Sequence, residues 1–591
     1  MSATWSFAVE ELASDLDDYA RRLADLSARA SAFAGRWRGR LGALTAAQFA
    51  AMLVELDELS GDLAAAATYP QLLSWMGDDS APDAEARASR PLAEIRDSLR
   101  LFTLEWGALD DETASRLLAA PELERDAYAL GLLRRRAAHA LSEEAERAVA
   151  ARQSSAETAW QELWHTTHSG IRVSFDGPDG VRDYTLPELG GFRASNDRDL
   201  RHRASALYYD SVLPHAKTLA TCYDTLVADR LAVDRLRGLG HPMEWTNLEN
   251  ELSNATVDNL LERVAANYGI GRDWYRTKAA LLGSDRLPIA DMAAPLGAGR
   301  TWTWDEALAG VRESFEVFPA EIRDLVDALV ADRHIDVFPR PGKASGALCQ
   351  GLSRRVKPYV LVNFTGSWHD PSILAHELGH AMHDWLFHNA QSQLSSYSDR
   401  GAIPRENACV AEIASTFAEH VYFESRYAAE KDENVRRELL AGLVDMSCNT
   451  VFVQVAFARY EQAAYELRAS GSPLTAEQLA DLFRAEFDLY FGDAVERPES
   501  HAYLWGHVPH FVYYRFNTYG YVFAKLVALA LFARFRADRE AFMADYVEFL
   551  RAGGSRSPRD LLAPFGFELE RPDCWDESLA ALAALRDELG T

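Results

Sequence analysis

The sequence has few cysteines, a deficit of positive charge and no long uncharged apolar run. Its five cysteines are an odd number, are widely spaced and form no CxxC pair. This excludes a disulfide framework or a thiolate metal site and predicts free thiols in a reducing compartment. Lys and Arg total 61 against 89 Asp and Glu, a net charge of −28. That balance argues against nucleic acid as a partner, because binding to phosphate depends on clustered basic residues.

Signals for export and for membrane insertion are also missing from the sequence. The first stretch, "MSATWSFAVEELASDLDDYARR", is acidic where a signal peptide is basic, and it has no apolar core. No stretch approaches 18 uncharged apolar residues, the length that a membrane span needs. We therefore expect a cytoplasmic protein without a membrane partner, and the sequence leaves its oligomeric state open.

Helical patterns dominate the chain. Residues 1 to about 170 are rich in Ala, Leu, Glu and Arg, with apolar residues every three or four positions, which predicts long packed helices. Near residue 170 an alternating stretch with turn pairs predicts a short hairpin. Strand-like segments then precede a helical pattern from 371 to the end. We expect a mainly α protein with one small sheet next to the helix near 371, a helical N-terminal lobe over 1–190 and a catalytic domain over 191–591.

The stretch "SILAHELGHAMHDW" carries the clearest chemical signal. His376 and His380 are four apart, so on a helix both imidazoles share one face and suit two ligands of one Zn²⁺. Glu377 follows the first histidine and projects beside the pair, the position of a general base that activates water. With 16 histidines in 591 residues, chance would produce HExxH in under roughly one such chain in ten. The pattern therefore favours a metal site over an ordinary helix with stacked histidines.

The third metal ligand must come from elsewhere in the chain. Metzincin spacing requires glycine and histidine three and six positions after the second histidine, where this chain has His383 and Leu386, so that class is excluded. Two glutamates remain. Glu406 follows a proline in polar loop texture, whereas Glu412 lies in an apolar helical run with Ser415 one turn on, able to support it. We predict that Glu412 is the ligand and keep Glu406 as the alternative.

These motifs together carry a family resemblance. "HELGHAMH" followed by "VAEIAST" resembles the oligoendopeptidase F branch of the thimet-oligopeptidase family of zinc metallopeptidases. "DVFPRPGKASGAL" and "PYVLVNF" are similar to its lead-in to the zinc helix, and "WGHVPHFVYYRFNTYGY" to its tyrosine-rich substrate segment. The similarity runs from about 195 to 525, with "SDRGAIPREN" as an apparent insertion. The resemblance implies a large two-lobed helical body that encloses a deep substrate channel.

The resemblance also assigns accessory residues. Peptide hydrolysis needs donors for the oxyanion besides the metal. The resemblance implies that the strand in "YVLVNFTG" adds an extended peptide to its edge, whereas the residues alone equally allow a buried sheet strand. A glycine-containing loop before this strand resembles a loop that closes over substrate. The resulting predictions are His510, Tyr519 and Tyr521 for the oxyanion, Tyr513, Tyr514, Gly346 and Asn363 for substrate binding, and His383 and Ser415 as supports beside the ligands.

We therefore predict a zinc endopeptidase that hydrolyses internal bonds of short unstructured oligopeptides. A first alternative is a peptidase that trims C-termini, of the carboxypeptidase or dipeptidyl carboxypeptidase type. It would need a cationic pocket for the terminal carboxylate, for which Arg515 and Lys525 are the candidates. A second alternative is a catalytically silent peptide-binding protein, which has no reason to keep Glu377.

Overall fold

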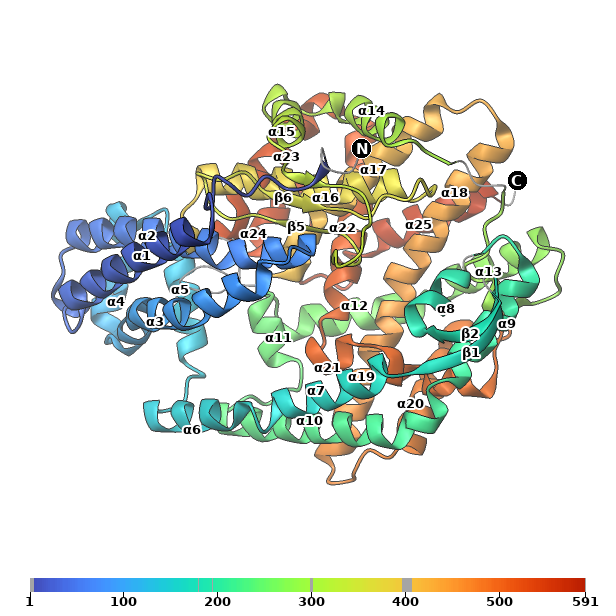
Figure 1. Ribbon diagram of the computed structural model, residues 1–591, viewed down its shortest axis with the longest axis horizontal. Coiled ribbons are helices and arrows are strands. Elements are labelled where there is room, and N and C mark those ends of the chain that lie inside the picture. Colours follow the sequence, from blue (N-terminus) through green and yellow to red (C-terminus); the bar gives the residue numbers. More distant parts are fainter. Residues whose placement is uncertain (1–4, 179, 194, 298–300, 396–406, 590–591) are drawn as a thin grey trace. The chain divides into compact units, whose positions relative to one another are not determined.

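The chain folds into a mainly helical protein with a few short strands (Figure 1). The computed structural model describes residues 5–178, 180–193, 195–297, 301–395 and 407–589. Contacts divide the chain into two compact units, each built from three separate stretches. The predicted boundary at residue 190 would divide the chain into two consecutive domains, whereas each compact unit combines segments that are far apart in sequence. The first unit comprises Met1–Ala138, Arg300–Arg426 and Leu531–Glu568, and the second comprises His139–Gly299, Tyr427–Ala530 and Leu569–Thr591.

The first unit contains the predicted N-terminal helices and the small sheet. Long helices α1, α2 and α3 lie side by side (Figure 1) and bury one large apolar cluster. The Asp15 side chain caps the first of them and Thr45 the second, where N-terminal N–H groups lack helical partners. The helices and strands of this unit are α1 Leu16–Trp37, α2 Ala46–Met76, α3 Ala81–Ala108, α4 Asp111–Leu118, α5 Ala127–Ala137, α14 Trp304–Ser314, α15 Ala320–Ala331, β4 Ile335–Asp336, β5 Leu348–Gln350, β6 Tyr359–Leu361, α16 Asp370–Ala390, α17 Ala408–Ala429, α23 Arg539–Ala552 and α24 Pro558–Leu562.

The small sheet lies against helix α16, as the sequence predicts. Its strand order is β4-β6-β5, with β4 parallel and β5 antiparallel to β6, and both β5 and β6 contact α16. Of the two predictions for "YVLVNFTG", the buried strand is confirmed and the edge strand is wrong. That stretch forms β6, which is central because its Val and Leu side chains are buried on both faces. The edge strands are β4 and β5, and β5 is partly exposed.

The second unit contains the predicted hairpin, which β1 and β2 form in antiparallel register. The two-residue strands β3 and β7 form a further small sheet that the sequence did not predict. Helix α22, Thr518–Ala537, contributes residues to both units. The other elements of the second unit are α6 Glu143–Gln153, α7 Glu157–Ser169, β1 Arg172–Gly177, β2 Gly180–Thr185, α8 Leu186–Phe192, α9 Arg198–Asp210, α10 Ala216–Arg237, α11 Glu244–Glu249, α12 Asn254–Ala266, α13 Gly269–Leu281, β3 Leu287–Pro288, α18 Glu433–Cys448, α19 Gln454–Ala469, α20 Ala476–Phe491, β7 Val495–Glu496, α21 His510–Tyr513 and α25 Asp576–Leu589.

Two helical stretches are long and apolar enough to cross a membrane by length and hydropathy alone. They are Glu433–Ala469 and Thr518–Ala537, and 67% and 83% of their apolar windows are buried inside the protein. The core helices of soluble proteins pass the same test. The sequence criterion missed both stretches because it required a run without charged residues.

Candidate metal centre and active site

Helix α16 presents the HExxH residues from a firmly anchored start. The Asp370 carboxylate accepts backbone N–H groups of Thr365, Gly366 and Ser367, at 2.6, 2.8 and 3.1 Å, which holds the turn between β6 and the helix. Apolar side chains on the opposite face of α16, including Leu374 and Leu378, are fully buried. The polar face is therefore presented in one fixed orientation.

His376, His380 and Glu412 form a group that can hold one metal ion. Their candidate ligand atoms all lie within 4.8 Å of one another. The Nε2 atoms of His376 and His380 are each 3.4 Å from the same Glu412 carboxylate oxygen. The described residues contain no second group of three such donors this close together. Two imidazoles and one carboxylate are the donor set of a catalytic zinc site, which leaves a position open for water or substrate.

Two supporting contacts orient these ligands. The Nδ1 atom of His376 lies 2.6 Å from a carboxylate oxygen of Glu419, a contact that directs Nε2 toward the group. The Ser415 hydroxyl donates to the Glu412 carboxylate at 3.1 Å. Sequence reasoning named Ser415 but missed Glu419. The signal was present, because Glu419 follows Glu412 by seven residues, two turns along the same face of α17.

The electrostatics of the group favour a bound cation. Burial by itself lowers the pKa of His376, but the charges of Glu419 and Glu412 outweigh it and raise that pKa well above its ordinary value. Burial works in the same direction on His380, and Glu412 again outweighs it, so the pKa of His380 is raised. The carboxylates thus stabilise positive charge between the imidazoles. A divalent cation can take the place of those protons, so the residues present fit a metal ion.

Glu377 lies beside the ligand group without joining it. Its side chain is buried, with 5% exposed, and burial raises the pKa of its carboxyl group. One of its carboxylate oxygens has no hydrogen-bond partner within the described part of the chain. A desolvated carboxylate with an open oxygen suits a group that takes up and releases a proton.

The ligand group and Glu377 line a cavity of about 400 Å³ within the first unit. Strand β5 forms part of its wall. The backbone N–H of Val360 in β6 donates to the carbonyl oxygen of His334 at 2.8 Å, so it points toward β4. Since successive strand residues turn their N–H and C=O groups to opposite edges, Cys349, paired with Val360, turns its own groups away from β6. No strand among the described residues pairs with that outer edge.

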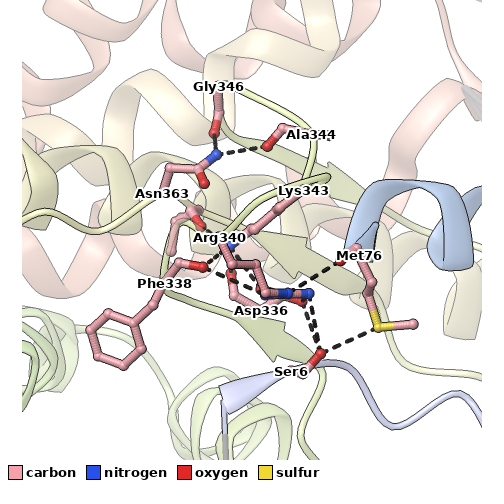
Figure 2. Close-up of polar contacts among 10 residues, drawn as sticks. Ser6, Met76, Asp336, Phe338, Arg340, Lys343, Ala344, Gly346 and Asn363 are labelled. Carbon is pink, nitrogen blue, oxygen red and sulfur yellow. Dashed lines mark hydrogen bonds and ion pairs between the residues drawn. The ribbon is translucent and has the colours of Figure 1, made fainter. Parts of the chain in front are cut away.

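A polar cluster fixes the loop that leads into β5 (Figure 2). The Lys343 ammonium and the Asp336 carboxylate, both fully buried, lie 2.7 Å apart. The Asn363 amide donates to the carbonyl oxygens of Ala344 at 2.9 Å and Gly346 at 2.8 Å. The structure thus brings the two predicted residues Gly346 and Asn363 together. It commits the Asn363 amide nitrogen to holding the loop.

His383 and Glu406 complete the account of the first unit. His383 is buried, its ring 5.9 Å from that of Phe549, and burial lowers its pKa to about 3. It therefore packs beside the site as a neutral ring and stands apart from the ligand group. Glu406 and residues 398–406 of the apparent insertion lie outside the described residues.

In the second unit, His510 lies among tyrosines. Its ring centroid is 5.9 Å from those of both Tyr514 and Tyr521. Tyr513 and Tyr514 are exposed, by 36% and 55%. Burial lowers the pKa of His510, so its imidazole is neutral near pH 7 and donates through one ring nitrogen. The structure brings these four predicted residues together.

Tyr519 is placed differently. It is fully buried, and its hydroxyl accepts a hydrogen bond from the Asn250 amide at 2.9 Å. Tyr521, two residues on in the same helix, points to another side because successive residues are about 100° apart and is partly exposed. The oxyanion role of Tyr519 stays a prediction, for a hydroxyl that already accepts a hydrogen bond from Asn250. Its side chain packs within the second unit.

Two residues that sequence reasoning missed hold this tyrosine-rich segment. The Arg230 guanidinium donates to the carbonyl oxygens of Phe511 and Val512, at 3.2 and 2.6 Å. The Glu461 carboxylate accepts the backbone N–H of Phe516 at 3.1 Å. Phe516 has a φ of 52°, a left-handed conformation that a bulky residue rarely adopts. The separations of 281 and 55 residues left no local signal for these contacts.

Comparison with known proteins agrees with this site. The family model described as "Peptidase family M3" matches residues 303–581, and the model described as "Oligopeptidase F" matches residues 105–172. The first match includes α16, α17 and the tyrosine-rich segment, so it contains His376, Glu377, His380, Glu412 and His510. The protein is therefore a metallopeptidase.

Relatives and a solved structure give the same result. The chain is 25% identical over 471 residues to the oligoendopeptidase F homolog of Borreliella burgdorferi, covering 78% of this chain and 77% of the relative. It is 25% identical over 468 residues to oligopeptidase PepF of Bacillus subtilis, covering 78% and 68%. Oligoendopeptidase-F from Enterococcus faecium has a similar fold, with a TM-score of 0.70, 20% identity and coverage of 96% and 98%. The chain belongs to peptidase family M3, in its oligoendopeptidase F branch, and is an oligopeptidase that hydrolyses peptides.

Proposed function

We propose that the protein is a zinc-dependent endopeptidase in which His376, His380 and Glu412 bind a single Zn²⁺. The observation that carries the proposal is the convergence of these three ligand atoms within 4.8 Å, with Glu377 lining the same cavity. When bound, the ion supplies a Lewis acid that polarises the scissile carbonyl and acidifies water.

Glu377 transfers the proton in this proposal. Its carboxylate takes a proton from the attacking water and delivers it to the leaving amine. Burial, which raises the pKa of Glu377, brings the carboxyl group nearer to the range in which it can both accept and donate at neutral pH. Its position one residue after His376 keeps it beside the ligands and out of the ligand set.

His510 and Tyr521 supply the donors for the oxyanion. Their rings are neighbours, at 5.9 Å, and each carries an N–H or O–H group. The exposed Tyr513 and Tyr514 serve the substrate backbone in the same segment. Preorganised donors of this kind typically contribute about 10² to 10³ in rate.

The outer edge of β5 receives the peptide in extended form. The outward N–H and C=O of Cys349 pair with the substrate backbone, an interaction that tolerates varied side chains. Such binding needs no chain terminus, which favours internal cleavage. Short unstructured peptides are the substrates that this mode admits, because a folded protein does not offer a free extended strand.

C-terminal trimming finds less support. The Arg515 guanidinium is committed to the Asp234 carboxylate and the Pro242 carbonyl oxygen. Lys525 is buried, with 2% of the residue exposed. The two cations expected to receive a terminal carboxylate are therefore engaged or covered in the second unit.

A cytoplasmic location is part of the proposal. All five cysteines are free thiols, as expected in a reducing compartment. The acidic net charge of −28 keeps nucleic acid outside the proposed partners, which are peptides alone.

The test is cleavage of an internally quenched oligopeptide by the wild-type protein and by Glu377→Gln, each with and without a chelator. We expect the chelator to abolish cleavage and the variant to lose about 10² to 10⁴ in rate while it still binds zinc. Product masses should show internal cutting. Activity that survives both treatments would sink the mechanism, and release of only C-terminal fragments of one or two residues would support trimming.

A further inference from the structure

The cavity of the first unit contains a third carboxylate that the mechanism does not use. Asp384 lies four residues after His380 on α16, so it projects from the same helix face one turn along. It lines the cavity of about 400 Å³ together with Glu377 and Glu412. Glu412 is committed to the metal and Glu377 to proton transfer. Asp384 therefore has no role in the proposed reaction.

The contacts of Asp384 place its carboxylate at the wall formed by β5 and the residue after it. The Cys349 thiol lies 3.9 Å from one carboxylate oxygen, and the backbone N–H of Gly351 hydrogen-bonds to the carboxylate. A side chain on Gly351 would collide with that carboxylate. Glycine at this position therefore makes room for Asp384 beside the strand edge.

The positive charge that acts on this carboxylate is that of His380, which lowers the pKa of Asp384 and belongs to the proposed metal ligands. The lining of the cavity, drawn from the described residues, contains no Lys or Arg. The neighbouring His383 and His388 are neutral near pH 7, because burial lowers the pKa of each to about 3. Burial also raises the pKa of Asp384 to about 6, which still leaves the carboxyl group mostly ionised at neutral pH.

Asp336, another buried aspartate of the first unit, shows the usual arrangement (Figure 2). Its carboxylate lies 2.7 Å from the Lys343 ammonium and 2.6 Å from the Arg340 guanidinium. Proteins rarely bury a carboxylate without such a cation, because desolvation of the charge is costly. At Asp384 no lysine or arginine has this role among the described residues that line the cavity, and the positive charge that acts on the carboxylate is that of His380, a proposed metal ligand.

We propose that Asp384 is a specificity-determining residue that receives the cationic side chain, lysine or arginine, of a peptide residue flanking the scissile bond. This inference rests on the proposed function. A peptide held along β5 turns alternate side chains toward the face on which the Cys349 thiol approaches Asp384. A basic side chain placed there meets the carboxylate in a cavity with little water, where charge-assisted hydrogen bonds are strong.

Asp384 has a simpler alternative role, which is to tie α16 to β5 through Gly351. Loss of such a tie would slow the cleavage of every peptide by a similar factor. A specificity role predicts selective loss for basic peptides alone. The two roles are therefore separable by comparing substrates.

The experiment uses pairs of quenched peptides that differ only by arginine or citrulline, its neutral isostere, at each of the two residues flanking the scissile bond. For the zinc-loaded wild-type protein we expect kcat/KM to be at least about tenfold higher for arginine at one of these positions. Asp384→Asn should bring the ratio close to one and leave cleavage of the citrulline peptide within about threefold. Asp384→Glu should restore part of the preference.

Asp57→Asn is the matched control. This aspartate of the first unit accepts the backbone N–H of Gln393 and does not line the cavity, so its ratio should equal that of the wild type. A wild-type ratio near one at both positions would overturn the inference without any variant. An unchanged ratio in Asp384→Asn, or an equal loss for both peptides, would also overturn it. Failure of the proposed function itself is distinct, since the wild type would then cleave no peptide of the set.

Discussion

The metal-binding helices and the tyrosine-rich segment hold their functional side chains in different ways. On α16 and α17 the proposed ligands His376, His380 and Glu412 follow helical periodicity, and their supports come from α17. The segment around His510 is a short helix, α21, followed by an irregular link to α22, and distant side chains such as Arg230 and Glu461 hold its backbone. The comparison teaches that a repeating backbone encodes a site locally, whereas an irregular one depends on long-range polar contacts.

Glu412→Ala breaks the first side of this comparison and should have the largest effect. Removal of one of three ligands leaves the two histidines of a single helix turn, which is too few for a stable zinc site. We expect loss of bound zinc, measured by mass spectrometry, and a fall in peptide cleavage of about a thousandfold or more. Glu406→Ala is the control and should retain both metal and activity. A Glu412→Ala protein with full metal content would refute the assignment.

Two tyrosine variants sharpen the other side. Tyr521→Phe removes a proposed oxyanion donor and should lower kcat by about a hundredfold. Tyr519→Phe removes only the hydroxyl that accepts from Asn250, so kcat should change by less than about threefold while the free energy of unfolding falls by about 1 kcal/mol. Steady-state kinetics and urea unfolding of both variants give the measurement. Equal kinetic losses would contradict the different placement of the two rings.

Glu419→Gln tests the support contact that sequence reasoning missed. Loss of the carboxylate at His376 Nδ1 should weaken zinc binding by about 10- to 100-fold, with most activity restored at saturating zinc. Competition against a chelator of known affinity measures the change. Glu424→Gln, five residues on in α17, is the matched control. An unchanged zinc affinity in Glu419→Gln would show that the contact does not orient His376.

His501→Phe should have the smallest effect, on the pH dependence of stability. Burial among phenylalanines lowers the pKa of His501 from 6.5 to about 3. As pH falls below 6.5 the unfolded chain takes the proton first, so stability that is complete above that pH declines down to about pH 3, by up to about 1.4 kcal/mol per pH unit. Urea unfolding between pH 6 and pH 4 should therefore show a shallower decline for the variant. Parallel curves would contradict this.

Parts of both units could be predicted because their signals are local. The hairpin near residue 170, the sheet before α16 and the pairing of His376 with His380 all follow from periods of two or four residues. The identity of the edge strand could not be predicted, since strand order depends on which segments meet in space. The same holds for Tyr519, whose hydroxyl meets Asn250 from a distant part of the chain. It also holds for the way in which each unit combines three separate stretches.

The sequence by itself determined the two histidines, the base between them and the choice of Glu412, because a helix places every fourth residue on one face whatever surrounds it. Tertiary structure alone decided that Glu419 contacts His376, that Asn363 holds the loop before β5, and that Asp384 lines a cavity whose described lining has no lysine or arginine. These outcomes depend on distances between segments that the chain connects only through long loops, and no local pattern carries that information.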